Sequence, residues 1–238
     1  MLFYSIIYGM KIDISEAAKI FIRKNKRLLI DTFSNDKVCP SQKDPVSIFM
    51  AGSPGAGKTE FCKNFIKETK VKVVRIDADD VREIIPQYTG RNSNQVQGAA
   101  ALGVEKLYDY VLAKNKSCIL DGTFAKFDIV SKNVERSIKR GRMVSIFYIY
   151  QNPLLAWRFT KAREALEGRR VPKVMFLDAF FNAKKNAEEI KKLYGDTVRL
   201  FLIERDAETN RYVFHHDIEN IDQYLEIPYT KSALRSLL

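Results

Sequence analysis

Three glycines, a lysine and a threonine stand at fixed spacing in Gly52-Ser53-Pro54-Gly55-Ala56-Gly57-Lys58-Thr59. The segment follows an apolar run, Val46 to Ala51, and precedes a helical pattern from about Lys58 to Lys67. Glycines here let backbone N–H groups turn inward toward an anion, and a helix N-terminus favours negative charge. The segment predicts a cradle for the phosphates of ATP, in which Lys58 bridges the β- and γ-phosphates and Thr59 gives its hydroxyl to Mg²⁺.

Carboxylates follow two further apolar runs. Three aspartates stand in Arg75-Ile76-Asp77-Ala78-Asp79-Asp80-Val81-Arg82, and one stands in Cys118-Ile119-Leu120-Asp121-Gly122-Thr123. A carboxylate at the rim of a phosphate site can accept a proton from a substrate hydroxyl as the phosphoryl group moves, or hold Mg²⁺ through water. The alternatives are helix capping by Asp79 or Asp80, and a turn in which Asp121 bonds its own backbone.

A basic segment, residues 158–173, contains six Lys or Arg and two Glu. A helical pattern, a glycine, paired arginines and a proline in succession predict a lid. Arginines from such a flap can fork onto γ-phosphate oxygens while closure excludes water. We expect this role for Arg169 or Arg170 at the turn, and a solvated helix face for Arg158 and Lys161.

These side chains need a scaffold of alternating strands and helices. That alternation predicts an α/β fold in three layers (αβα), with a mainly parallel sheet, helices on both faces and ligands at the carboxyl ends of the strands. We expect strands at 46–51, 71–76, 117–120, 143–150, 198–204 and 211–215, and helices at 58–67, 79–85, 93–113, 127–140, 153–167 and 173–194.

An N-terminal appendage precedes this pattern. Residues 15–33 have apolar positions at helical spacing and predict a basic amphipathic helix, followed by a polar loop, 34–45. We expect residues 1–45 to be appended to a nucleotide-binding domain of residues 46–238, within a single globular unit, and residues 220–238 to form a short helical tail. The first nine residues lack a basic region and a cleavage site, which argues against a signal peptide.

The composition is that of an ordinary globular protein, with 46% hydrophobic and 29% charged residues. No apolar run approaches the roughly 18 residues of a membrane span. Three cysteines without CxxC spacing, Cys39, Cys62 and Cys118, argue against disulfides or zinc and favour a reducing cytoplasm. We expect Cys62 and Cys118 to be packing residues. The net charge of +11 suits nucleic acid or a substrate with several phosphates equally, and nucleic acid is the less favoured partner.

Taken in order, these motifs resemble the zeta toxin family. The resemblance covers about Val46 to Leu202, through G-x-P-G-x-G-K-T, I-D-x-D, an acid-Gly-Thr strand end and a lid with separated arginines. It implies a P-loop kinase, a phosphotransferase with an alcohol group as acceptor, from toxin–antitoxin systems. Well-known members phosphorylate the 3′-hydroxyl of UDP-N-acetylglucosamine. The resemblance also implies a small helical antitoxin that blocks the ATP site.

The resemblance assigns catalytic roles to four residues. The second acid of I-D-x-D is Asp79, which becomes the base for the sugar hydroxyl. Arg163 and Arg169 fall where the family has two arginines for the γ-phosphate, and Lys58 completes the set.

The acceptor side carries the main departure from the family. Glu105 matches a family acid that contacts the sugar, and Asp121, Thr123 and Arg82 complete the predicted acceptor site. The family carries Glu where this chain has Asp121, which is shorter by one methylene. The shorter side chain displaces its hydrogen bond to the acceptor. That displacement favours another sugar nucleotide, or a different hydroxyl compound, as the substrate.

Two other functions stay open. The charge and the same P-loop chemistry suit a polynucleotide 5′-hydroxyl kinase, although no track of aromatic and basic residues stands out. The second open function is a nucleotide-dependent binding module, which a partner protein neutralises and which docks through its basic N-terminal helix.

Overall fold

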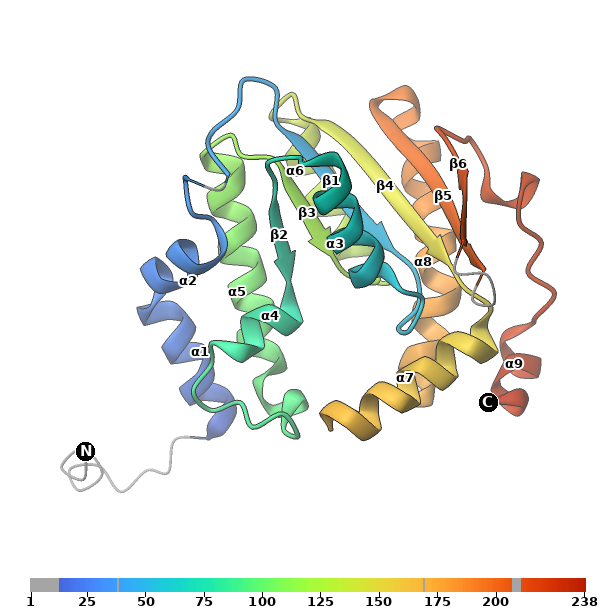
Figure 1. Ribbon diagram of the computed structural model, residues 1–238, viewed down its shortest axis with the longest axis horizontal. Coiled ribbons are helices and arrows are strands. Elements are labelled where there is room, and N and C mark those ends of the chain that lie inside the picture. Colours follow the sequence, from blue (N-terminus) through green and yellow to red (C-terminus); the bar gives the residue numbers. More distant parts are fainter. Residues whose placement is uncertain (1–12, 38, 169, 207–210) are drawn as a thin grey trace.

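The computed structural model describes residues 13–37, 39–168, 170–206 and 211–238. Its centre is a six-stranded sheet of order β2-β3-β1-β4-β5-β6 (Figure 1). Strands β1 to β5 pair in parallel and β6 runs antiparallel to β5, so the predicted α/β class and mainly parallel sheet are confirmed. The strands are β1 Val46–Ala51, β2 Val74–Asp77, β3 Cys118–Asp121, β4 Met143–Tyr150, β5 Val198–Asp206 and β6 Arg211–His215.

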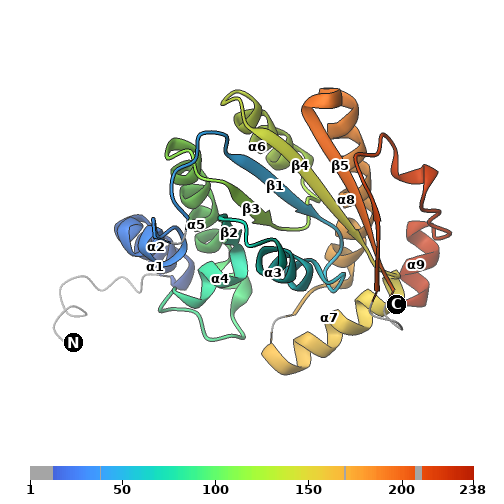
Figure 2. The ribbon, with the colours of Figure 1, turned by 45° about the horizontal axis from the view of Figure 1, so that its top comes forward.

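Helices cover both faces of this sheet. Figure 2 shows α5, α6 and α8 on one face and α3 on the other. The alternation in β1 explains this, because Phe49 and Ala51 join the core cluster beneath α5, whereas Ile48 and Met50 pack with Phe61 of α3. The helices are α1 Ile14–Lys24, α2 Lys26–Phe33, α3 Lys58–Thr69, α4 Ala78–Glu83, α5 Ser93–Ala113, α6 Phe127–Ile138, α7 Pro153–Glu167, α8 Lys173–Tyr194 and α9 Lys231–Leu237, with short 3₁₀ turns η1 Gly195–Thr197 and η2 Ile221–Gln223.

The predicted helix over residues 15–33 is two helices, which corrects the sequence prediction. Asn25 lies between α1 and α2 with φ −109° and ψ 38°, outside helical geometry. Its side-chain Nδ2 donates to the carbonyl of Phe21 at 2.9 Å. Asparagine competes in this way for backbone groups, and an apolar pattern that continues through it does not reveal the break.

The two N-terminal helices pack against the rest of the chain. Ala18, Ile22 and Leu29 are almost fully buried in the cluster that includes Val96 of α5. The division into residues 1–45 and 46–238 stays a prediction. Residues 1–12, on which the expectation about a signal peptide rests, lie outside the described residues.

Cys39, Cys62 and Cys118 are buried and free of disulfides. The prediction that Cys62 and Cys118 are packing residues is therefore confirmed. Within the described ranges, each helix is too short or too polar to cross a lipid bilayer.

Candidate active site

The predicted phosphate cradle connects β1 to α3 at the carboxyl edge of the sheet. Gly52 and Gly55 adopt φ values of 137° and 73°, which other residues rarely adopt. A Cβ on Gly52 would lie 2.4 Å from the carbonyl oxygen of Ile149, and one on Gly55 would lie 2.1 Å from that of Ala156. The loop therefore needs glycine for its turns and for close packing against β4 and α7.

Lys58 begins α3 directly after this loop. Its side chain is mostly buried, and Nζ donates to the carbonyl oxygen of Ser53 at 2.6 Å. The backbone N–H of Gly52 donates to the carbonyl of Thr123 at 3.2 Å. The loop is thus tied to the segment after β3, where the second acidic motif lies.

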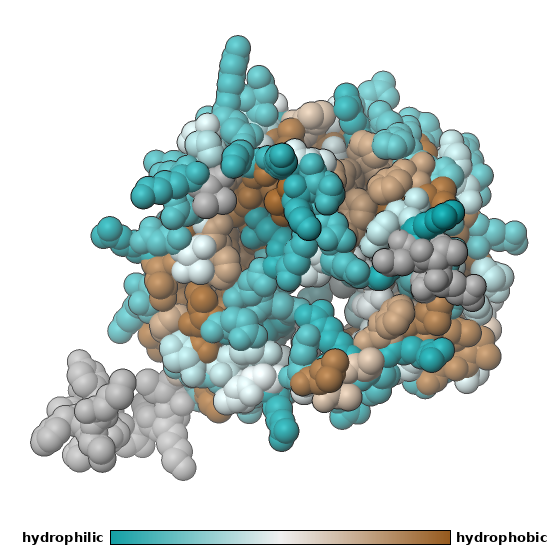
Figure 3. Space-filling view, in the orientation of Figure 1, coloured by the Kyte–Doolittle hydropathy of each residue, from teal (hydrophilic) through white to brown (hydrophobic). Residues whose placement is uncertain are grey.

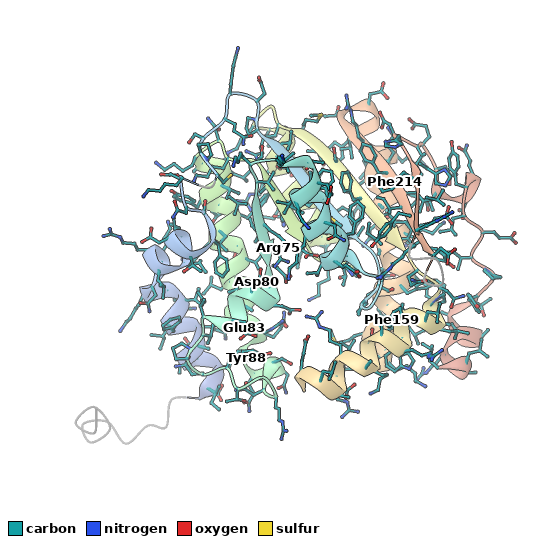
Figure 4. The ribbon with its side chains drawn as sticks, in the orientation of Figure 1. Arg75, Asp80, Glu83, Tyr88, Phe159 and Phe214 are labelled. Carbon is teal, nitrogen blue, oxygen red and sulfur yellow. The ribbon has the colours of Figure 1, made fainter. Side chains whose placement is uncertain are left out.

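The acids of the two strand-end motifs meet beside α3. Asp77 and Asp121 are paired in the register of β2 and β3, and the guanidinium Nη1 of Arg75 donates to both, at 2.7 and 2.8 Å. Its Nη2 bonds Asp80. In Figure 4, Arg75 and Asp80 lie next to each other at the end of β2 and the start of α4.

Asp77, and not Asp79 or Asp80, caps α4. Its side chain accepts from the backbone N–H of Asp79 at 2.8 Å. The alternative in which Asp79 or Asp80 caps the helix was wrong, because α4 begins at Ala78, one residue earlier than the sequence predicted. Both are first-turn residues instead, so their carboxylates are available for other contacts.

Burial and mutual repulsion act on this acidic group. Burial raises the pKa of Asp77, the charge of Asp121 adds to the rise, and Arg75 opposes it. Burial also raises the pKa of Asp80, again against the pull of Arg75. Burial raises the pKa of the Cys62 thiol to about 12, with a further contribution from Asp121. Because Cys62 lies one turn along α3 from Lys58, the acidic group is close to the phosphate-binding helix.

Asp79 connects α4 to α7. One carboxylate oxygen bonds Arg82, whose side chain is buried, and the other lies 3.5 Å from Nη2 of Arg163. Arg163 also donates to Glu167 at 2.7 Å. One turn earlier on α7, Thr160 contacts the loop at Gly55. A single helix thus touches both the phosphate loop and the predicted base.

The remaining residues predicted from the sequence differ in their exposure and contacts. Glu105 is exposed on α5 and, within the described part of the chain, forms no hydrogen bond or ion pair. It lies about two turns along α5 from Gln97, which bonds Arg82. Arg169 lies outside the described residues. Arg158 and Lys161 are exposed, as predicted for a solvated face. Hydrophilic side chains gather over the middle of the face in Figure 3.

Arg75 was missed by the sequence reasoning, although β2 contained the signal. Val74 and Ile76 point to the core beneath α5, so Arg75 and Asp77 must point to the face of α3. A charged residue two positions before a strand-end acid is therefore its neighbour on that face.

The sequence model of the zeta toxin family matches residues 30–217, well over half of the chain. Toxin PezT of Streptococcus pneumoniae serotype 4 (strain ATCC BAA-334 / TIGR4) is 28% identical over 130 residues, or 52% of this chain and 51% of that toxin. The match thus spans about half the length of this relative.

Solved structures give the same result for the fold. A structure from the PezAT chromosomal toxin–antitoxin system of Streptococcus pneumoniae has a TM-score of 0.65 at 19% identity and covers 94% of both chains. The complex of AvrRxo1-ORF1 with AvrRxo1-ORF2 and ATP has a TM-score of 0.60 at 15% identity, over 89% of this chain and 68% of that chain. The predicted P-loop kinase fold is confirmed.

Proposed function

The chain belongs to the zeta toxin family of P-loop kinases, and we propose that it uses ATP and Mg²⁺ to phosphorylate a hydroxyl group of a sugar nucleotide. UDP-N-acetylglucosamine is the first candidate. The observation that carries the proposal is the meeting of Asp79 and Arg163, 3.5 Å apart, on a helix pair that also contacts the phosphate loop. A base and a γ-phosphate cation are the two groups that phosphoryl transfer to a hydroxyl requires.

The donor side consists of the loop from Gly52 to Thr59. Its backbone N–H groups and the N-terminus of α3 hold the phosphates of ATP. Lys58, now bonded to Ser53, turns to the β- and γ-phosphates when they arrive. Arg163 and Arg169 stabilise the charge that develops on the transferred group.

The residues present suit Mg²⁺. Thr59 offers a hydroxyl oxygen on the first turn of α3, and the strand-end aspartates offer carboxylate oxygens, the ligand type that Mg²⁺ prefers. Among the described residues no group of three His, Cys, Asp or Glu is arranged to hold a metal ion. When bound, Mg²⁺ neutralises charge on the phosphates.

The acceptor side lies between α4, α5 and the end of β3. Asp79 accepts the proton of the acceptor hydroxyl, while Arg82 orients it through their ion pair. Glu105 and Thr123 line the acceptor. Asp121 acts there through Arg75, since its side chain is only 2% exposed.

Mass spectrometry tests this function directly. Purified protein is incubated with ATP, Mg²⁺ and a panel of UDP-sugars, with Asp79→Asn as the control. We expect UDP-N-acetylglucosamine to gain one phosphate with the wild-type protein only. Protein that binds ATP but leaves the whole panel unmodified would reject the substrate class, and label transferred to a 5′-hydroxyl oligonucleotide in the same panel would favour a polynucleotide kinase.

We also propose a small helical partner protein that blocks the ATP site, in a reducing cytoplasm. The related structures support the partner, since one comes from the PezAT toxin–antitoxin system and another is of AvrRxo1-ORF1 with AvrRxo1-ORF2. The three free, buried cysteines support the compartment. Competition between ATP and the protein encoded by the neighbouring reading frame tests the partner, and simultaneous binding of both would contradict it.

A further inference from the structure

Arg75 is a buried cation with three carboxylate partners. Its side chain is 14% exposed and bonds Asp77, Asp80 and Asp121. Burial works against the charged form of Arg75, but the three carboxylates together raise its pKa above the ordinary value. A guanidinium offers five donors in a fixed plane, so it can hold several carboxylates in one arrangement.

The three partners differ in their access to solvent. The side chains of Asp77 and Asp121 are 10% and 2% exposed, whereas that of Asp80 is 38% exposed. Asp77 is further engaged in capping α4. Asp80 uses Oδ2 for Arg75, and its other oxygen has no hydrogen-bond partner among the described residues. The network thus presents one fixed carboxylate to the solvent side of the site.

Asp79 and Asp80 occupy adjacent positions at the start of α4 but face different elements. Asp79 contacts Arg163 on α7, and Asp80 contacts Arg75 on β2. Arg75 points to the face of the sheet that α3 covers, so Asp80, which bonds Arg75, lies on the side of α3. An acceptor that delivers one hydroxyl to Asp79 and reaches toward α3 would meet a second carboxylate, that of Asp80.

We propose that Asp80 is an acceptor-binding residue and that Arg75 is its positioning residue, with Asp121 as the buried counter-ion of Arg75. The acceptor is then a compound with a second hydroxyl next to the one that is phosphorylated, and Asp80 accepts a hydrogen bond from it. This inference rests on the proposed function and narrows its substrate class. It also assigns an indirect role to Asp121, which stands where the family carries glutamate.

Steady-state kinetics with the best acceptor of the UDP-sugar panel test the assignment. Asp80→Asn keeps the shape of the side chain and removes its charge, so we expect the KM for the acceptor to rise about tenfold, with kcat and the Kd for ATP unchanged. Arg75→Gln should raise the same KM, the double variant should show no added effect, and Arg75→Lys should recover part of the loss. For an acceptor analogue that lacks the neighbouring hydroxyl, Asp80→Asn should leave the KM unchanged.

The exposed ion pair Arg27–Asp31 on α2 offers matched controls, Arg27→Gln and Asp31→Asn, which should leave all constants unchanged. An Asp80→Asn variant with the wild-type KM would overturn the inference while leaving the proposed function intact. Wild-type protein that transfers phosphate to no hydroxyl compound would overturn both. If Arg75→Gln fails to fold, Asp80→Asn and the deoxy analogue decide the question alone.

Discussion

Cations lie at both ends of the sheet, and they bind mainly backbone carbonyls at one end and carboxylates at the other. At the amino-terminal edge, Lys116 Nζ donates to the carbonyls of Ser34 and Cys39 at 2.8 and 2.7 Å, and it also bonds the exposed carboxylate of Asp36. At the carboxyl edge, the edge with α4 and α7 in Figure 1, Arg75 and Arg163 bind carboxylates. A backbone carbonyl cannot leave its cation, whereas an arginine can exchange a side-chain carboxylate for a phosphate, and the carboxylate can then accept a proton.

Arg142 extends the pattern at the amino-terminal edge. It donates to the carbonyls of Val46 and Lys116 at 2.9 and 2.6 Å and to the hydroxyl of Ser47 at 2.8 Å. These bonds join the starts of β1, β3 and β4. We therefore expect the cations at this edge to stabilise the fold, and under the proposed function those at the other edge serve the reaction. Four predictions test that distinction.

The largest effect is expected from Asp79→Asn at the carboxyl edge. Loss of the general base should lower kcat by about 10²- to 10⁴-fold, because the acceptor hydroxyl no longer has a group to take its proton. The free energy of unfolding should change little, since asparagine keeps a side-chain oxygen for Arg82 and the lost charge no longer repels that of Asp77. Kinetics and urea unfolding measure the two quantities, and a large loss of stability with normal kcat would reverse the assignment.

Arg163→Gln should have the next largest effect. Removing a cation from the transferred phosphoryl group should lower kcat on the order of 10²-fold. Its side chain is 48% exposed, so stability should stay within about 0.5 kcal/mol of the wild type. Arg158→Gln, an exposed position on the same helix, is the matched control. Equal kinetics for the two variants would remove Arg163 from the reaction.

At the amino-terminal edge, Lys116→Met should have the opposite effect, a loss of stability with normal catalysis. The side chain is 1% exposed, and its loss leaves two buried carbonyls without a donor, at a cost of about 3 kcal/mol in the free energy of unfolding. The kcat of the folded fraction should stay normal. Urea unfolding is the measurement, with Arg27→Gln as the control. A variant as stable as the wild type but slower in catalysis would break the comparison between the two edges.

The loop from Gly52 to Gly57 was predictable because its geometry is local. Eight consecutive residues contain the glycines that the loop needs, and their order already implies the strand before and the helix after. Long elements with clear patterns were also predictable, since strand 143–150 and helices 93–113, 153–167 and 173–194 have the expected bounds. Asn25, by contrast, interrupts a helix without interrupting the apolar pattern.

The contacts of Arg75 with the strand-end acids were less predictable, because they depend on how the strands pair across the sheet. Arg75 and Asp121 are 46 positions apart in the sequence, and the contact exists only because Asp77 lies opposite Asp121 in the register of β2 and β3. Register is set by packing of both faces, which no local motif encodes. The sequence could identify the acids at the strand ends, but not the arginine that holds them.

The smallest effect concerns pH, and it has opposite signs at the two edges. Bonding to Lys116, and the charge of Lys116, lower the pKa of Asp36, whereas burial and then the charge of Asp121 raise the pKa of Asp77. A lowered pKa adds stability above the pKa of the unfolded chain, and that stability is lost as the pH falls. A raised pKa has the opposite effect. Between the pKa of the unfolded chain and the higher pKa of Asp77, the folded protein still holds its proton while the unfolded chain has lost it, so stability falls as the pH rises through this interval.

The stability difference between wild type and Asp36→Asn should therefore grow as the pH rises from about 3 to about 7, and that between wild type and Asp77→Asn should shrink. Asparagine caps helices as well as aspartate, so Asp77→Asn isolates the charge. Urea unfolding of the three proteins across this range measures both differences. Parallel pH profiles for the two variants would show that the carboxylates at the two edges share one electrostatic environment, and the distinction drawn from their cations would then fail.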